Sequence, residues 1–453
     1  MKRDWLEIKD RSIIIWGAGN VGKIMSRYLT PFVNIKAFCD RDSNKWRAES
    51  EDGIPCVPIE ELGNDDVVLI AVENADAASE IAGELEKRKL DYCHITEAVE
   101  YYLPEWDRRE VAKYEKTYGK ENRERDNRLT KFVDCYVPYH NCNLKCNYCY
   151  VRQRGKFAER KILWHSPEFI SKALSFERLG GMALINLCAR GETMLTPGLI
   201  PIIKELVCAG HYISIISNGT ATKAFEQLLS QDMDLSHIFV KFSLSYLELK
   251  RLGLLMVFAD NVKKVRAAGC SITVEVVPDD ILVPYIPEIK AFSMEQFGAL
   301  PHTTIPRDER MTELNVLTNQ SMEDFKENWG FDSAMFDFKM AVLYEKRNER
   351  CLAGKGSFSL NLETGDMQKC VGNPYMGNLY EDISKEIVWD EVGLKCCLPY
   401  CYNGHAYLTL GLIKEIKAPT YYEVRDRLTV DGTHWVTDTM KEVFIQRLYE
   451  NND

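Results

Sequence analysis

The sequence predicts an α/β protein with two successive series of alternating strands and helices and a small cysteine-rich region behind them. In the first hundred residues, short apolar runs alternate with amphipathic segments, and a second series of the same kind begins at Phe132. From Cys351 onward, glycine turns and cysteines replace this alternation. A chain of 453 residues has room for about three domains. The predicted division is 1–100 for the first domain, 101–131 for a linker, 132–310 for the second domain, 311–345 for a connecting segment, 346–405 for the third domain and 406–453 for a C-terminal tail.

The N-terminal region carries a glycine-rich turn between its first strand and first helix. We expect strands at 13–16, 35–40 and 67–72 and helices at 21–29 and 75–89. Gly17, Gly19 and Gly22 lie in the first turn, and Asp40 ends the next strand, which matches the dinucleotide-binding fingerprint. The region resembles short Rossmann-like domains of enzymes that make sugars and surface polysaccharides. Three interpretations remain open: bound NAD, a nucleotide or nucleotide-sugar, or a docking or structural domain whose glycines serve only the turn and helix packing.

The segment 101–131 is dominated by charged residues and shows no sustained apolar face. This pattern predicts a solvated linker that is partly helical. The second series then supplies six strands, expected at 132–138, 183–188, 212–217, 238–244, 271–277 and 300–305. Six β/α units favour a partial, open barrel with a parallel sheet over a closed barrel of eight strands.

Charge and hydropathy exclude several classes of protein. The chain has 57 Lys and Arg against 68 Asp and Glu, a net charge of −11, which argues against nucleic-acid binding. The N-terminus lacks a signal-peptide layout, and no apolar run approaches the ~20 residues of a membrane span. We therefore expect a cytoplasmic protein without a membrane partner. In such a chain, 15 cysteines indicate metal binding or catalysis rather than disulfides.

Three cysteines lie close together directly after the first strand of the second series. The sequence HNCNLKCNYCY places Cys142, Cys146 and Cys149 in one loop. Thiolates are the usual ligands of iron–sulfur clusters, and three of them leave one iron of a [4Fe–4S] cluster open. The alternative from the same residues is a zinc site completed by His140.

The triplet, with Tyr148 before its last cysteine, resembles the signature of the radical S-adenosylmethionine (SAM) superfamily, and further motifs follow in the family's order. Its Gly-Gly-Glu motif, which holds the methionine amino group of SAM, corresponds to Gly191 and Glu192, with Arg190 replacing the first glycine. The resemblance implies further SAM contacts on the ends of later strands, at Asn218, Ser243 and Glu275.

The resemblance implies an enzyme that cleaves SAM reductively to a 5′-deoxyadenosyl radical, with the electron coming from a reducing protein such as a flavodoxin or ferredoxin. We expect oxidation or remodelling of a small molecule, with a sugar or nucleotide-sugar as the suggested class. One alternative is a peptide-modifying maturase of the same superfamily. Another is a zinc-stabilised binding scaffold without chemistry.

The second cysteine group comprises Cys351, Cys370, Cys396, Cys397 and Cys401. The turn at 363–366 predicts a β-hairpin between the first two cysteines. The pattern resembles the twitch or SPASM extension of radical SAM enzymes, which implies an auxiliary [4Fe–4S] cluster. Its implied ligands are Cys351, Cys370, Cys401 and one of Cys396 and Cys397, and its implied role is electron acceptor. A structural zinc site on the same thiolates is the alternative.

Overall fold

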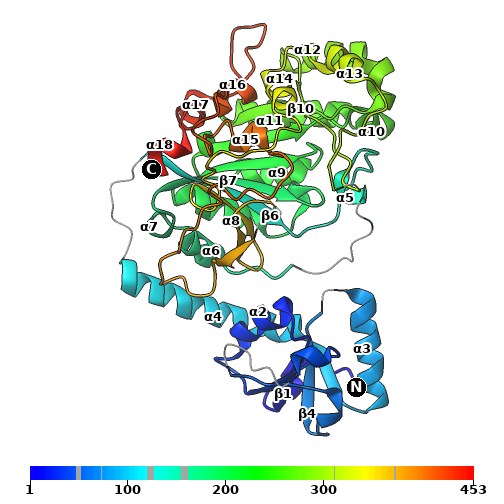
Figure 1. The fold of residues 1–453 in the computed structure, drawn as a ribbon, viewed down its shortest axis with the longest axis vertical. Coiled ribbons are helices and arrows are strands. Elements are labelled where there is room, and N and C mark those ends of the chain that lie inside the picture. The colour runs from blue at the N-terminus through cyan, green and yellow to red at the C-terminus, as the bar shows by residue number, and fades with distance from the viewer. Residues whose placement is uncertain are drawn as a thin grey trace. The chain divides into compact units, whose positions relative to one another are not determined.

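The computed structural model of this chain describes residues 1–46, 53–72, 74–119, 127–153, 155, 162–310, 312–371 and 374–452. The chain forms two compact units, shown in Figure 1. The first contains residues 1–117 and 160–169, and the second contains residues 118–159 and 170–453.

The first unit is built on a parallel sheet of five strands, in the order β3-β2-β1-β4-β5. The neighbouring inner strands β1 and β4 are almost entirely apolar. Ile13, Ile14 and Ile15 of β1 are fully buried, as expected for parallel strands that are covered on both faces. The predicted N-terminal parallel sheet is therefore confirmed. Its elements are α1 (Trp5–Ile8), β1 (Ser12–Trp16), α2 (Asn20–Leu29), β2 (Ile35–Cys39), β3 (Cys56–Val57), β4 (Asp66–Ile70), α3 (Ala75–Lys87) and β5 (Asp91–His94).

Helix α4 (Ile95–Tyr118) forms the helical part of the predicted linker, but it is not solvated all round, because one side is buried. Leu103, Trp106 and Tyr114 are buried at helical spacing, which the many charges between them hide in the sequence. The buried Asp107 also has partners: one carboxylate oxygen lies 2.6 Å from Nδ1 of His165, whose Nε2 lies 3.0 Å from the hydroxyl of Tyr28. Residues 120–126 of the predicted linker lie outside the described residues.

The second unit contains a sheet of nine strands, in the order β11-β10-β9-β8-β7-β6-β12-β13-β14. The six strands from β6 to β11 are parallel to their neighbours, which confirms the parallel series predicted from the sequence. They are β6 (Leu129–Val137), β7 (Met182–Ala189), β8 (Tyr212–Ser217), β9 (Ile238–Ser243), β10 (Ser271–Val276) and β11 (His302–Thr303).

The predicted hairpin of the cysteine-rich region extends this sheet rather than forming a separate small domain. Strand β12 (Ser357–Asn361) pairs in parallel with β6, and β13 (Asp366–Gln368) and β14 (Tyr375–Asn378) follow in antiparallel. The edge of β6 is thereby covered, and the six parallel strands and the three strands that follow Cys351 belong to one continuous sheet.

The helices of the second unit follow the strands as β/α units, and two more fill the predicted connecting segment. They are α5 (Tyr150–Gln153), α6 (Pro167–Ala173, which begins in the first unit), α7 (Phe176–Leu179), α8 (Leu199–Cys208), α9 (Thr222–Leu229), α10 (Tyr246–Arg251), α11 (Leu255–Ala267), α12 (Ile286–Phe297), α13 (Met322–Trp329) and α14 (Ala334–Ala341). Within the described residues, no helix combines the length and the apolar composition needed to cross a membrane.

The predicted C-terminal tail is also corrected, because its residues help to build the core of the second unit. It forms α15 (Gly404–Tyr407), α16 (Tyr421–Arg425), α17 (Asp438–Phe444) and α18 (Leu448–Asn452). Tyr421 and Phe444 are fully buried in a cluster with Phe132 and Phe239 of the barrel strands. Apolar residues scattered among polar ones show no strong period in the sequence, which explains why this segment was interpreted as a tail.

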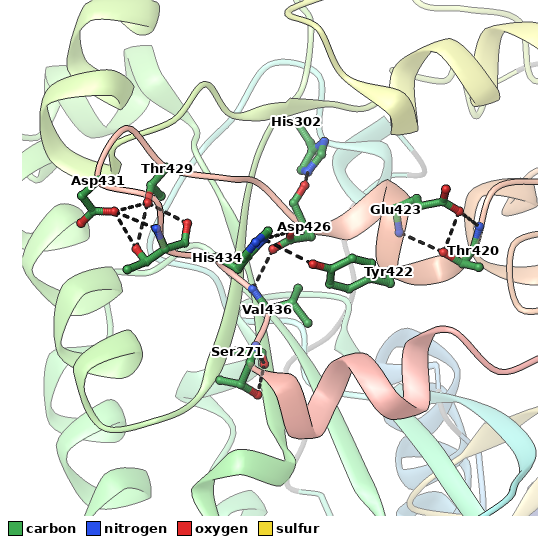
Figure 2. Close-up of polar contacts among 12 residues, drawn as sticks. Ser271, His302, Thr420, Tyr422, Glu423, Asp426, Thr429, Asp431, His434 and Val436 are labelled. Atoms are coloured by element: carbon green, nitrogen blue, oxygen red, sulfur yellow. Dashed lines mark hydrogen bonds and ion pairs between the residues drawn. The ribbon is translucent and has the colours of Figure 1, made fainter.

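Polar contacts fasten the same segment to the barrel (Figure 2). The backbone N–H of Val436 donates to Asp426 over 3.0 Å, and Nε2 of His302 lies 3.1 Å from the carbonyl oxygen of Asp426. The hydroxyl of Ser271 on β10 accepts the backbone N–H of Thr437 at 2.9 Å. The C-terminal segment therefore lies against the last two barrel strands.

Candidate active site

The first cysteine group lies in the loop between β6 and α5. Cys142 is exposed, and Cys146 and Cys149 are half-buried. Helix α5 begins directly behind the loop, with the backbone N–H of Gln153 donating to the carbonyl of Cys149. Because β6 is the first strand of the parallel series, the three thiols lie at the carboxyl edge of the sheet, where barrel enzymes carry their sites.

The end of β7 approaches the cysteine loop through its backbone. The N–H of Gly191 donates to the carbonyl of Tyr139 at 2.7 Å, and the N–H of Glu192 donates to that of Asn141 at 2.9 Å. A Cβ atom at position 191 would stand 2.1 Å from the carbonyl oxygen of Asn141. Only glycine permits this approach, so the predicted Gly-Glu motif first of all shapes the cysteine loop.

We expect Gly191→Ala to displace the cysteine loop and to lower the free energy of unfolding by about 1–3 kcal/mol, as overpacked sites do. Gly83→Ala is the matched control, because a Cβ at Gly83 in helix α3 meets no atom within 4 Å. Urea denaturation of both variants measures the difference. Equal stability of G191A and the wild type would contradict the tight approach.

Glu192 is buried, with 2% of its surface exposed, and accepts three hydrogen bonds. One carboxylate oxygen accepts from the hydroxyl of Ser217 (2.6 Å) and the N–H of Met194 (2.9 Å), and the other accepts from the N–H of Asn218 (2.7 Å). Burial raises the pKa of Glu192 above its usual value, although these donors oppose the shift. A carboxylate offers about four acceptor positions, so one remains for a further donor.

Asn218, at the end of β8, connects the third predicted motif to the cysteine loop. Its side-chain amide donates to Oδ1 of Asn143 at 2.8 Å and lies 3.8 Å from the sulfur of Cys142. The amide of Asn143 in turn donates to the hydroxyl of Thr220 over 2.7 Å. The ends of β6, β7 and β8 therefore meet in one hydrogen-bonded site, as the motif order predicts.

On the other side of the loop, Tyr148 contacts a residue that the sequence analysis did not select. Its hydroxyl donates to the hydroxyl of Ser245 at 2.9 Å, whereas the predicted Ser243 accepts the backbone N–H of Ser245 through its carbonyl. Burial raises the pKa of Cys146, and hydrogen bonds with Ser245 and Tyr148 oppose the rise. The only sequence signal for Ser245 is its place two residues after the end of β9.

Glu275, the last predicted SAM contact, forms an ion pair with Arg425 of α16. The Arg425 side chain is 1% exposed, so this pair is a buried contact between the barrel and the C-terminal segment. A partner 150 residues away leaves no signal in the sequence around Glu275.

His140, proposed as the fourth ligand in the zinc alternative, faces Arg190. Nε2 of His140 lies 3.5 Å from a guanidinium nitrogen of Arg190, which also lies over the ring of Tyr136. Across the described residues, no three His, Cys, Asp or Glu side chains are placed to hold one metal ion. A [4Fe–4S] cluster binds each thiolate through a different iron, so its ligands need not converge on one point.

Four of the five thiols in the second cysteine group influence one another electrostatically. Burial raises the pKa of Cys370 to about 12, with contributions from Cys351 and Cys396. Burial also raises the pKa of Cys401 well above its usual value, and Cys370, Cys351 and Cys396 add to the shift. Cys351, Cys396 and Cys401 also pack against the apolar cluster that contains Cys370, whereas Cys397 is exposed. This packing distinguishes Cys396 from its neighbour Cys397.

In the first unit, the glycine motif serves the packing of β1 and α2. Gly17 has a φ of +123°, and a Cβ there would stand 2.6 Å from the carbonyl oxygen of Ala71. A Cβ at Gly22 would stand 1.9 Å from the carbonyl oxygen of Gly17, whereas Gly19 has open space around it. Of the open interpretations, this geometry favours the structural one for Gly17 and Gly22.

Asp40, the predicted ribose ligand, forms hydrogen bonds and an ion pair with other residues of the first unit. One carboxylate oxygen accepts the N–H of Ala18 in the glycine turn (3.0 Å) and the ammonium of Lys45 (2.9 Å). The other oxygen accepts the N–H of Asp42 (3.0 Å). Burial alone would raise the pKa of Asp40, but these contacts outweigh burial and lower it. A nucleotide at this turn stays a prediction.

No family model and no curated protein matches this sequence. The solved structures that match include native anSMEcpe with bound AdoMet, at 13% identity and a TM-score of 0.39, covering 55% of this chain and 78% of that one. Streptococcus suis SuiB bound to its precursor peptide SuiA matches at 14% identity and a TM-score of 0.39, with 73% and 80% covered. The FeFe-hydrogenase maturase HydG from Carboxydothermus hydrogenoformans matches at 18% identity and a TM-score of 0.29, with 57% and 64% covered.

Because the TM-scores are below 0.5 and the identities are low, the likeness concerns the general fold and carries no inference about activity or substrate. The function is therefore argued from the residues of this chain.

Proposed function

We propose that this chain is a radical SAM enzyme that binds a [4Fe–4S] cluster through Cys142, Cys146 and Cys149. The observation that carries the proposal is the direct hydrogen bonding among three motifs from three strand ends. Gly191 and Glu192 bind the backbone of the cysteine loop, and Asn218 binds both Glu192 and the loop. A chance match to the cysteine spacing would not bring the other two motifs to the same place.

The residues present fit SAM as well as the cluster. When bound, the cluster and SAM supply the reductive cleavage that starts radical chemistry. Glu192 has one acceptor position left for the ammonium of SAM, and its burial strengthens such a charged hydrogen bond. Gly191 keeps the loop close to that carboxylate. Tyr148 and Ser245 fix the opposite side of the loop through their shared hydrogen bond.

The decisive experiment is anaerobic reconstitution with iron and sulfide, reduction with dithionite and chromatographic detection of 5′-deoxyadenosine. We expect the cluster-loaded protein to form this product from SAM. A reconstituted protein that holds iron and sulfide but forms none would contradict the proposal. Tightly bound zinc without sulfide would indicate the binding scaffold.

We also infer that Cys351, Cys370, Cys396 and Cys401 bind an auxiliary [4Fe–4S] cluster. Their shared packing supports this set, because Cys370 belongs to one apolar cluster and Cys351, Cys396 and Cys401 pack against that cluster. Thiolates of cysteines are the usual ligands of such iron–sulfur clusters. Such a cluster would supply an electron acceptor for an oxidative reaction.

The substrate class is a further part of the proposal. The sequence analysis prefers a sugar, but no contact in the described residues supports one. Among the solved neighbours, SuiB is described with a precursor peptide, and a second structure of anSMEcpe is described with a peptide. A peptide is therefore kept beside the sugar as a second candidate class, and the two classes are tested by adding peptides or nucleotide-sugars to the SAM cleavage assay. A modified product from only one of the two classes would assign the substrate class.

We expect Glu192→Ala to weaken SAM binding by roughly ten- to a hundredfold, because a hydrogen bond to a charged group contributes about 1.5–3 kcal/mol. Ser217→Ala is the matched control, since it removes one donor to Glu192 but keeps the carboxylate. Equilibrium binding of SAM to the cluster-loaded variants measures the difference. If E192A binds SAM as the wild type does, Glu192 is only a structural link.

A further inference from the structure

The carboxyl side of the barrel gathers several cations whose partners differ. Arg425 pairs with Glu275, and Arg307 pairs with Glu309 at 3.1 Å. Lys241 on β9 donates to the side-chain oxygen of Asn186 at 2.6 Å, and the amide of Asn186 donates to Asp134 at 2.8 Å. Each of these three cations is thus linked to a carboxylate, directly or through one amide.

Lys339 differs from them. It lies on α14, which packs against β11, α15 and α16, and its ammonium donates to the hydroxyl of Thr304 at 2.5 Å. Among the described residues, no carboxylate lies within ion-pair distance of this ammonium. Thr304 follows β11 directly, so Lys339 stands at the same edge of the sheet as the cysteine loop.

His405 on α15 is the second group in this region whose polar atoms are incompletely paired. Its Nδ1 is buried and has no hydrogen-bond partner among the described residues. A buried polar atom without a partner costs roughly 1–3 kcal/mol, so such atoms often face a ligand.

The electrostatics agree with a missing negative charge. Burial above all, together with Arg307 and Arg425, lowers the pKa of Lys339 to about 7, although Glu275 opposes the shift. Burial also lowers the pKa of His405 well below its usual value, and Lys339, Arg425, Lys241 and Arg307 add to this shift. An anion beside Lys339 would offset the positive charges of Arg307 and Arg425, and α15, which carries His405, packs against α14, which carries Lys339.

We infer that Lys339 and His405 bind an anionic group of the substrate, either a carboxylate or a phosphate. The inference rests on the proposed function, because the substrate must approach SAM at this edge of the barrel. A carboxylate or phosphate oxygen can accept from the Lys339 ammonium and from Nδ1 of His405 in the tautomer that carries its proton there.

The test is calorimetric titration of the cluster-loaded protein, without SAM and at constant ionic strength, with inorganic phosphate in one arm and acetate in the other. We expect at least one anion to bind, with Lys339→Met weakening the binding by about ten- to a hundredfold. Lys339→Arg should retain it, and His405→Phe should weaken it. The control is Lys263→Met, because Lys263 is exposed and its ammonium donates to Gln296.

Binding of phosphate alone would assign a phosphorylated substrate, and binding of acetate would assign a carboxylate. No binding of either anion, or equal binding to K339M and the wild type, would overturn the inference. SAM is titrated into K339M as well, and an equal loss of SAM affinity would place Lys339 at SAM and overturn the inference too. Formation of 5′-deoxyadenosine by the wild type reports on the proposed function independently.

Discussion

Changing Cys142, Cys146 and Cys149 together to alanine is expected to abolish the formation of 5′-deoxyadenosine from SAM. The three thiols are the proposed protein ligands of this cluster, so the triple variant leaves the loop without a thiolate to hold it. The rest of the site should persist, because Gly191, Glu192 and Asn218 bind the loop through its backbone and Asn143. The readouts are product formation and iron and sulfide content after reconstitution.

The triple variant should keep about half of the iron, if each of the two proposed clusters holds four. Cys208→Ala is a suitable control, since Cys208 is exposed at the end of α8 and away from both cysteine groups. Product formation by the triple variant would show that the loop is not the site of SAM cleavage.

The second large effect is expected from the paired variants Cys396→Ala and Cys397→Ala. Cys396 packs, with Cys351 and Cys401, against the apolar cluster that contains Cys370, whereas Cys397 is exposed. We therefore expect C396A to lose the auxiliary cluster, about four irons, and C397A to keep it. Each variant is the other's matched control, because the two residues are adjacent.

Iron and sulfide analysis with Mössbauer spectra measures this difference. Loss of the cluster in C397A but not in C396A would contradict the assignment. Four irons and one tightly held zinc in the wild type would identify the second group as structural zinc. An oxidative reaction would then lack its electron acceptor, and a redox-neutral reaction would replace it in the proposal.

At the N-terminal glycine turn, the sequence motif predicts the local backbone structure but not the role of its acidic residue. The strand–turn–helix around Gly17 and Gly22 follows from the sequence, since only glycine fits the close approach of β1, α2 and Ala71. The role of Asp40 does not follow, because its hydrogen bonds with Ala18 and Lys45 depend on how the turn folds back. The dinucleotide-binding fingerprint therefore indicates a strand–turn–helix structure, which occurs both in nucleotide-binding domains and in purely structural ones.

By itself, the sequence determined the two parallel β/α series, the cysteine loop and the order of the motifs on the strand ends. These features depend on residues that are neighbours in the chain, where hydrophobic period, turn chemistry and ligand spacing act directly. Only the tertiary structure decided the pairing of Glu275 with Arg425, the hydrogen bond of Tyr148 with Ser245, and the packing of Tyr421 and Phe444 with Phe132 and Phe239. Each of these contacts joins segments that are far apart in the sequence. Packing in a shared core brings such segments together, and no local sequence pattern encodes that packing.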